Sequence, residues 1–383
     1  MAANGLTWHV RPPKAWNRSK PGPALLLLHG SNMSSKSYVL SVAHAWPKLA
    51  EDFALVGIDG EQRVPGSPDD APAFNYTYVN WGGRSKYPGT QARESPPLVV
   101  EALAEIRKAL PLSKVLVGGH SQGGFLSYLL FLNYPETFAG AFPISCGLVV
   151  QAEPTAFEDA ALRAEQRRGA LAIVHAQDDP VVSFSSGDAA YGAFLDDAFP
   201  ALTFFAPKTG AHMFMRLPIE EAVRRLDAQT SDDPKALAAF LRERVEAKAW
   251  RDVWAAAERL KRLDAKRQHV GAADAALKAR EAAATTAAAP LRKAMAAKDD
   301  SWVEAFVAFR HDFEGAAAAK PITSLYTDRR EAQRKEAEKL WAEARAAWGR
   351  DDAAAAEAAC RTLMSRCPAS LQYRWARNAL KKA

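Results

Sequence analysis

The chain has 383 residues, of which 48% are hydrophobic and 25% are charged, and its formal net charge is +6. These fractions are ordinary for a folded globular protein and exclude an intrinsically disordered chain. No apolar window approaches the roughly 20 residues that a membrane-spanning helix needs, so we expect no membrane span. The length exceeds that of one typical domain and predicts two.

The cysteines and the first residues bear on the cellular compartment. Cys146, Cys360 and Cys367 are an odd number for a disulfide framework, and none has metal-ligand spacing with a histidine. The first nine residues contain no charged segment followed by an apolar stretch, as a secretory signal would. We therefore expect a cytoplasmic protein without structural disulfides.

Two apolar runs predict core strands in the first part of the chain. Residues 23–28 (Pro-Ala-Leu-Leu-Leu-Leu) open into residues 29–32 (His-Gly-Ser-Asn), where a glycine lets the backbone approach a substrate closely. Residues 54–58 predict a second strand, which ends at Asp59. We interpret Asp59 as a turn former, and a second acid near the sheet edge is the alternative.

A connection of unusual length, residues 60–97, contains many prolines, glycines and aromatic residues. A stretch this long without periodicity is usually functional or disordered, and its aromatic residues argue against disorder. Its place after a core strand predicts a lid or pocket wall at the mouth of a site. Tyr76, Tyr78 and Trp81 would either contact the substrate or pack the connection down, and we keep both roles open.

The next predicted strand, residues 114–118, runs directly into Gly119-His120-Ser121-Gln122-Gly123. A strand that passes through Gly-x-Ser-x-Gly into a helix is the sequence form of a nucleophile elbow, a strained turn that exposes the serine hydroxyl above the sheet. The apolar residues that follow predict a buried helix that stops at Pro135. Ser121 is therefore the candidate nucleophile.

A serine nucleophile needs a base to take its proton and a third group to orient that base. Residues 170–174 predict a strand that is followed by Asp178 and Asp179, and residues 202–205 predict another that leads to His212. Both groups would lie at the carboxyl edge of a parallel sheet, where open α/β folds bind ligands. The order serine, acid, histidine is the one that this chemistry has in α/β-hydrolases.

From about residue 8 to about residue 229 the chain resembles an α/β-hydrolase. Its His-Gly pair, its Gly-His-Ser-Gln-Gly-Gly elbow and its Asp-Pro-Val-Val segment are similar to those of carboxylesterase/phospholipase and dienelactone-hydrolase-like enzymes. The resemblance implies Asp179 as the acid, because the family places it directly before Pro-Val-Val, and Asp178 is the alternative. It also implies a doubly wound, mostly parallel sheet and chemistry without a metal or an organic cofactor.

The expected activity is that of a serine esterase acting on a small-molecule ester. Ser121, Asp179 and His212 would form the catalytic triad. The backbone N–H groups of Gln122 and of Ser31, or else of the residue after Ser31, would bind the oxyanion. A thioesterase or peptidase with the same triad is an alternative, and so is a non-catalytic hydrolase-fold scaffold that acts through a helical C-terminal domain.

The composition changes near residues 229–234, beyond which the chain is rich in Ala, Arg, Lys and Glu. This profile predicts helices, so we expect an α/β-hydrolase domain over residues 1–230 and a C-terminal all-α domain over residues 231–383. The hairpin over residues 340–368 resembles a tetratricopeptide unit. A generic bundle of helical hairpins is the other interpretation, since no matching repeat is evident upstream.

Residues 231–383 hold 30 Lys and Arg against 22 Asp and Glu. The two signs are interspersed, as on exposed salt-bridged helices, so we expect no nucleic-acid partner. We consider this domain a possible site of homo-oligomer formation or of docking to a protein partner, with core packing as the alternative role of its large aromatic residues, Trp302, Phe306, Phe309, Trp341 and Trp348.

Overall fold

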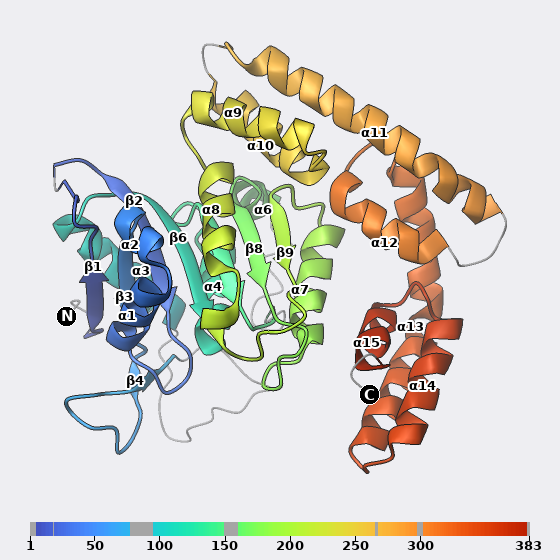
Figure 1. Cartoon of the computed structure of the whole chain (residues 1–383), viewed down its shortest axis with the longest axis horizontal. Helices are drawn as coiled ribbons and strands as arrows, with labels where there is room; N and C mark the ends of the chain where they lie inside the picture. The colour runs from blue at the N-terminus through green and yellow to red at the C-terminus, as the bar shows by residue number, and fades with distance from the viewer. Residues whose placement is uncertain are drawn as a thin grey trace. The chain divides into compact units, whose positions relative to one another are not determined.

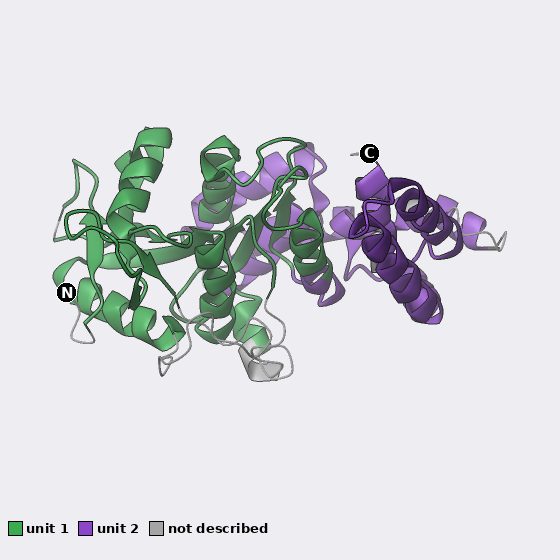
Figure 2. Cartoon of the chain, turned by 90° about the horizontal axis from the view of Figure 1, so that it is seen from below, with its two compact units in different colours: residues 1–192, 200–232 green, residues 193–199, 233–383 purple. Residues whose placement is uncertain are grey.

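The computed structural model of the chain describes residues 5–17, 19–76, 95–148, 160–264, 267–296 and 302–380. The chain divides into two compact units (Figure 2). One comprises residues 1–192 and 200–232, and the other comprises residues 193–199 with 233–383. The second unit thus takes in a segment near residue 196 that is remote from it in sequence. The expected division into domains at residue 230 stays a prediction.

The first unit is built on a seven-stranded sheet with the strand order β1-β3-β2-β6-β7-β8-β9 (Figure 1). Neighbouring strands are parallel except for β1, which pairs antiparallel with β3. The strands are β1 (Trp8–Arg11), β2 (Gly22–Leu28), β3 (Ala54–Ile58), β6 (Leu112–His120), β7 (Gly140–Ile144), β8 (Ala170–Val174) and β9 (Leu202–Phe205). A separate two-stranded pair is formed by β4 (Gln62–Arg63) and β5 (Phe74–Asn75).

Helices cover this sheet. Residues of β3, β7 and β8 are buried throughout, as expected for parallel strands with both faces covered. In Figure 1, α1 (Ser35–Ala45) and α8 (Ile219–Gln229) lie in front of the sheet. The helix that follows the elbow, α4 (Gln122–Asn133), packs against β2, β6 and β7. The other helices described in this unit are α2 (Pro47–Asp52), α3 (Ser95–Ala109), α6 (Ala160–Gln166) and the 3-10 helix η1 (Phe214–Arg216). A further helix, α7 (Phe184–Asp196), begins in this unit, and its last four residues belong to the second unit.

The strand order reverses at β2. From β2 the chain continues to β3 on one side, and it later adds β6 on the other side. Leu28 at the end of β2 is paired with Gly119 on β6, so the segments that begin at His29 and His120 leave the sheet next to each other. Open α/β folds bind ligands at such a switch point. The two motifs singled out in the sequence therefore meet where the topology favours a site.

The described part of the second unit is helical apart from its turns. Its helices are α9 (Pro234–Glu246), α10 (Trp250–Leu263), α11 (Val270–Ala296), α12 (Trp302–Phe313), α13 (Lys320–Trp348), α14 (Ala353–Arg366) and α15 (Leu371–Leu380). α9 begins where the sequence predicts a helix start. The Asp233 side chain accepts the Lys235 N–H at 2.9 Å, and Pro234 occupies the first helical position, where no N–H is needed. The mostly parallel sheet and this helical region confirm the expected fold class.

The aromatic residues considered for partner docking divide into two groups. Trp302, Phe306 and Phe309 are each at most 7% exposed and pack in one core cluster, so they serve the interior. Trp341 and Trp348 are partly buried, with ring centroids 5.7 Å apart. The oligomeric or partner role of this unit stays a prediction, as does the tetratricopeptide likeness of the α13–α14 hairpin.

No helix in the described ranges has the length and apolar character needed to cross a bilayer.

Candidate functional site

Ser121 lies between β6 and α4 with φ 54° and ψ −115°. A φ in the left-handed region is uncommon for a residue other than glycine and indicates a strained backbone. The Ser121 N–H donates to the Ile144 carbonyl on β7 at 2.9 Å, and the Ser121 carbonyl accepts the Gly124 N–H at 2.9 Å. The turn therefore has the conformation of a nucleophile elbow, and the adjoining strand and helix hold it in place.

Close packing requires the glycines on either side of Ser121. A Cβ on Gly123 would lie 2.2 Å from the Leu28 carbonyl oxygen, and a Cβ on Gly119 would lie 2.5 Å from the backbone of Gly123. Only glycine avoids these clashes. This close contact brings the first turn of α4 against the end of β2, and so brings Gln122 near the segment after Leu28.

The candidate acid and base are in direct contact. His212 Nδ1 lies 2.8 Å from Asp179 Oδ2, and Asp179 Oδ1 accepts the N–H groups of Val181 at 2.9 Å and Val182 at 3.0 Å. Burial raises the pKa of Asp179, but hydrogen bonds from His175, His212 and the two amides outweigh it and hold that pKa well below its usual range. An ionised Asp179 keeps the proton of neutral His212 on Nδ1. This leaves Nε2 as the atom that can accept a proton.

The neighbouring carboxylate, Asp178, holds the backbone instead of the ring. It accepts the Ala211 N–H at 2.8 Å and the Gly210 N–H at 3.4 Å. These two residues directly precede His212, and Ala211 has a φ of 50°. Asp178 therefore stabilises the conformation of the loop that carries His212. The geometry favours Asp179 over Asp178 as the group that orients the base.

His175 ends a buried strand, which is typical of a structural histidine, and it contacts the acid. Its Nε2 lies 2.9 Å from the Val182 carbonyl and 3.5 Å from Asp179 Oδ2, and its side chain is fully buried. Because a carbonyl oxygen only accepts, Nε2 carries the proton and places a positive edge beside Asp179. The position of His175 directly after the strand that precedes the acid is the one sequence signal for this contact.

The loop of His212 lies against the elbow. The rings of His212 and His120 are 4.5 Å apart between centroids, and His120 is 7% exposed. Burial, together with the nearby His212, lowers the pKa of His120 to about 4, so its ring is uncharged at neutral pH. Within the described ranges, no hydrogen bond joins Ser121 Oγ to His212. Catalytic hydrogen bonds are often long before substrate binds and tighten in the complex.

Residues 30–33, which follow β2, face the elbow. The Asn32 N–H donates to Asn75 Oδ1 at 3.0 Å and is therefore engaged. The Ser31 N–H has no backbone acceptor among the residues with described positions. Gln122 is the first residue of α4, so its N–H has no partner within the helix.

Asp59 accepts the Ser35 N–H at 2.6 Å and so stabilises the start of α1.

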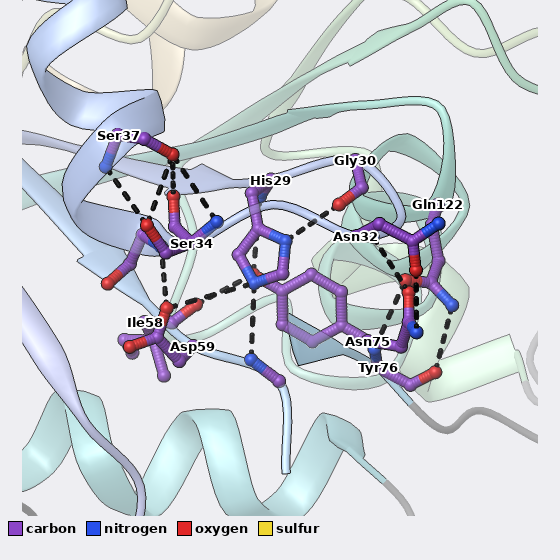
Figure 3. Close-up of polar contacts among 12 residues, drawn as sticks. His29, Gly30, Asn32, Ser34, Ser37, Ile58, Asp59, Asn75, Tyr76 and Gln122 are labelled. Carbon is purple, nitrogen blue, oxygen red and sulfur yellow. Dashed lines mark hydrogen bonds and ion pairs between the residues drawn. The ribbon is translucent and has the colours of Figure 1, made fainter. Parts of the chain in front are cut away.

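Tyr76 packs the connection after β5 onto the sheet. It is 3% exposed, and its ring stacks on His29 with centroids 4.5 Å apart (Figure 3). Its hydroxyl donates to the Ile58 carbonyl at 2.7 Å and accepts the His29 N–H at 3.2 Å. Of the two roles considered for Tyr76, burial supports the packing role, and a contact with the substrate stays a prediction. Tyr78 and Trp81 lie outside the described residues.

Potential metal ligands are dispersed. In the part of the chain that the structure describes, no group of three or more histidine, cysteine or acidic side chains could hold a metal ion. The three cysteines are buried and unpaired with one another.

The class of fold is that of an α/β-hydrolase. It is defined by the strained serine after β6, the buried acid after β8 and the histidine after β9.

A family comparison agrees with this class. Residues 98–213 match the profile of the phospholipase/carboxylesterase family, a segment that includes Ser121, Asp179 and His212 but less than half of the chain. The match confirms the resemblance expected from the sequence and supports a hydrolase. A sequence search of curated proteins found no match.

Many solved structures are similar to this chain. A thermostable esterase is 18% identical with a TM-score of 0.42; the alignment covers 58% of each chain, so this chain spans little more than half of that protein. Acyl-protein thioesterase 2 of Zea mays is 17% identical with a TM-score of 0.42, over 59% of this chain and 99% of that one. The Bacillus cereus carboxylesterase is 15% identical with a TM-score of 0.38, over 59% and 93%. Sequence identities and TM-scores as low as these do not indicate the substrate of this chain.

Proposed function

We propose that this protein is a serine hydrolase that cleaves carboxylic esters through an acyl-enzyme intermediate. Ser121 is the nucleophile, His212 is the general base and acid, and Asp179 orients His212. The observation that carries the proposal is the 2.8 Å contact between His212 Nδ1 and Asp179 Oδ2. It is supported by the strained Ser121 turn and by the contact of the His212 ring with His120 beside it.

The roles follow from the protonation states. Neutral His212 accepts the Ser121 hydroxyl proton at Nε2 as the oxygen attacks the acyl carbonyl carbon, and ionised Asp179 stabilises the imidazolium that forms. The tetrahedral intermediate then expels the alcohol, which takes the proton from Nε2. Water then attacks the acyl-serine and gives a proton to His212, and His212 returns this proton to the Ser121 oxygen as the carboxylic acid leaves.

The oxyanion of the tetrahedral intermediate needs hydrogen-bond donors, each worth on the order of 3–4 kcal/mol. The backbone N–H groups of Gln122 and Ser31 supply them. Gln122 lies at the N-terminus of α4, where the helix dipole also favours negative charge. The Asn32 N–H already donates to Asn75 Oδ1, which supports Ser31 over Asn32 as the second donor.

Exposed apolar side chains near the acid and the base favour an ester with an apolar acyl or alcohol part. Val181 is 68% exposed, Met213 42% and Met215 50%. Val181 lies two residues after Asp179, and the methionines lie one and three residues after His212 in the chain. Large apolar side chains in contact with water often mark binding surfaces, and methionine adapts to irregular apolar groups.

Hydrolysis of p-nitrophenyl acetate, butyrate and octanoate by the wild type and Ser121→Ala tests the proposal. We expect turnover by the wild type, a loss of several orders of magnitude in the variant, and fluorophosphonate labelling of the wild type alone. Ser365→Ala, at an exposed position on α14, is the matched control and should retain full activity. Thioester and anilide substrates in the same panel would separate a thioesterase or a peptidase from an esterase. A wild type that neither hydrolyses esters nor takes the label contradicts the proposal.

A further inference from the structure

The dipeptide Asn75–Tyr76, at the end of β5, contacts both segments that carry the proposed oxyanion donors (Figure 3). One segment is the turn over residues 30–33, and the other is the start of α4 at Gln122. These segments are about 90 residues apart in sequence and come from neighbouring strands. We call Asn75 and Tyr76 the bracket, because together they form hydrogen bonds to both segments.

Asn75 is joined to the turn by a reciprocal pair of hydrogen bonds. The Asn32 N–H donates to Asn75 Oδ1 at 3.0 Å, and Asn75 Nδ2 donates to Asn32 Oδ1 at 3.2 Å. Asn75 is 4% exposed, and Asn32 has a φ of 61°. A left-handed backbone outside glycine persists only where its surroundings hold it. Asn75 therefore stabilises the strained residue that directly follows Ser31.

Tyr76 is joined to the elbow by a second reciprocal pair. The Tyr76 N–H donates to Gln122 Oε1 at 3.1 Å, and Gln122 Nε2 donates to the Tyr76 carbonyl at 3.0 Å. The amide of Gln122 thus pairs with the backbone of Tyr76 as a neighbouring strand would. Gln122, whose backbone N–H is one of the proposed donors, is therefore fixed in place by the hydrogen bonds of its side chain.

The bracket is itself fixed to the core. The Tyr76 hydroxyl is bound to β3 at Ile58 and to the end of β2 at His29, as described above. A Cβ on Gly60 would lie only 2.1 Å from the Asn75 carbonyl oxygen, so the backbone passes over Asn75 in close contact. The bracket therefore has little room to move relative to the sheet.

We propose that Asn75 and the side chain of Gln122 are positioning residues, which fix the separation between the Ser31 and Gln122 N–H groups through the bracket. This inference rests on the proposed function. The β2–β6 ladder ends at Leu28 and Gly119, so beyond that point the sheet does not hold the two segments together. Oxyanion donors must lie near 3 Å from the developing charge, and a displacement of about 1 Å can reduce the rate roughly 100-fold.

Kinetics of Asn75→Ala and Gln122→Met test the proposal. Each variant keeps both proposed backbone donors and removes one of the two hydrogen-bonded pairs that join the bracket to the donor segments. We expect kcat to fall roughly 10- to 100-fold with KM little changed. The inhibition constant of a trifluoromethyl ketone, whose adduct carries an oxyanion, should rise by the same factor as kcat falls. The value of kcat is calculated from the concentration of active sites, which is measured by titration with a fluorophosphonate. Unfolded protein then does not lower the measured kcat.

The double variant and a control separate positioning from general destabilisation. If both residues act through one bracket, the loss in Asn75→Ala/Gln122→Met should be smaller than the product of the single losses. Asn17→Ala removes an asparagine side chain that accepts two hydrogen bonds in an exposed turn, and it should keep the wild-type kcat.

Two results would overturn the inference. One is an Asn75→Ala protein with a lowered thermal midpoint but an unchanged kcat per titrated site. The other is a rise in KM without a change in the ketone affinity, which would indicate a substrate contact. If Asn75→Ala does not fold, Gln122→Met decides between the outcomes by the same two measurements. A wild type without hydrolysis or label contradicts the proposed function itself, and the positioning role with it.

Discussion

Asp178 and Asp179 are adjacent in the chain, yet they hold different parts of the same loop. The Asp179 carboxylate contacts the ring of His212 at 2.8 Å, whereas the Asp178 carboxylate accepts the backbone N–H groups of Gly210 and Ala211. One carboxylate therefore orients a side chain, and its neighbour holds the backbone that presents that side chain.

Asparagine substitutions should separate these two roles. Asp179→Asn places an amide beside His212 Nδ1 and favours the wrong tautomer, so we expect kcat to fall roughly 10³- to 10⁴-fold. Asp178→Asn keeps an oxygen acceptor for the Ala211 N–H at 2.8 Å and loses the one for the more distant Gly210 N–H, so we expect a far smaller loss of kcat and a loss of stability of about 1 kcal/mol. Steady-state kinetics and urea unfolding of both variants check this. Equal losses of kcat would show that the carboxylates share the role.

Stability should depend on pH through two buried histidines. Burial lowers the pKa of His29 to about 4, and burial with the nearby His212 lowers that of His120 to about 4. Because an unfolded histidine titrates near 6.5, the unfolded state binds more protons than the folded state between pH 4 and pH 6.5. The free energy of unfolding should therefore rise with pH across this window, by up to about 3 kcal/mol per histidine, and level off above it.

Urea unfolding from pH 4 to pH 8 measures this dependence. His120→Gln should make the slope shallower, and Ser365→Ala, at an exposed position on α14, should leave it unchanged. The depressed pKa of Asp179 acts at lower pH: its stabilisation is present above the unfolded value near 4 and is lost as the pH falls below it. An unchanged slope in His120→Gln would contradict the assignment.

Two glycine substitutions should have effects of opposite sign. A Cβ on Gly123 would lie 2.2 Å from the Leu28 carbonyl oxygen, so Gly123→Ala must displace the elbow and should lower the free energy of unfolding by several kcal/mol. A Cβ on Gly271, in α11, would meet no atom within 4 Å. Gly271→Ala should stabilise the protein by up to about 1 kcal/mol, since alanine favours the helix. Thermal midpoints of both variants provide the measurement.

A buried arginine should matter for the second unit. The Arg310 side chain is 6% exposed and forms ion pairs with Asp196 at 2.8 Å and with Glu314. Removing it in Arg310→Met leaves Glu314 buried without its partner, so we expect a loss of about 3–5 kcal/mol. Arg330 pairs with the same Asp196 but is 27% exposed, and Arg330→Met should lose less than about 1 kcal/mol. Similar losses in urea unfolding of the two variants would argue against this difference.

The strands that could be predicted are those with a purely local signal. The structure has strands over residues 54–58, 170–174 and 202–205 with the predicted bounds, because each is a short apolar run between turns. β7 was not predicted. It contains Gly140 and Pro143, and a proline lacks the N–H that a central strand uses. Its place between β6 and β8 depends on neighbours that its own five residues do not reveal.

The amino-acid sequence by itself determined the mostly parallel α/β sheet, the helical composition after about residue 230, and the order in which a serine, an acid and a histidine follow three of the strands. Local patterns carry these features, because burial, turns and helix starts depend on nearby residues. Only the tertiary structure decided which of Asp178 and Asp179 contacts His212, that His175 lies beside the acid, and that Tyr76 is buried. It also brought Asn75 to Asn32 and Gln122 to Tyr76. The contact between His175 and Asp179 lies within one loop, whereas the others join segments far apart in the sequence. The distance between such segments is fixed by strand order and packing, which no local pattern contains.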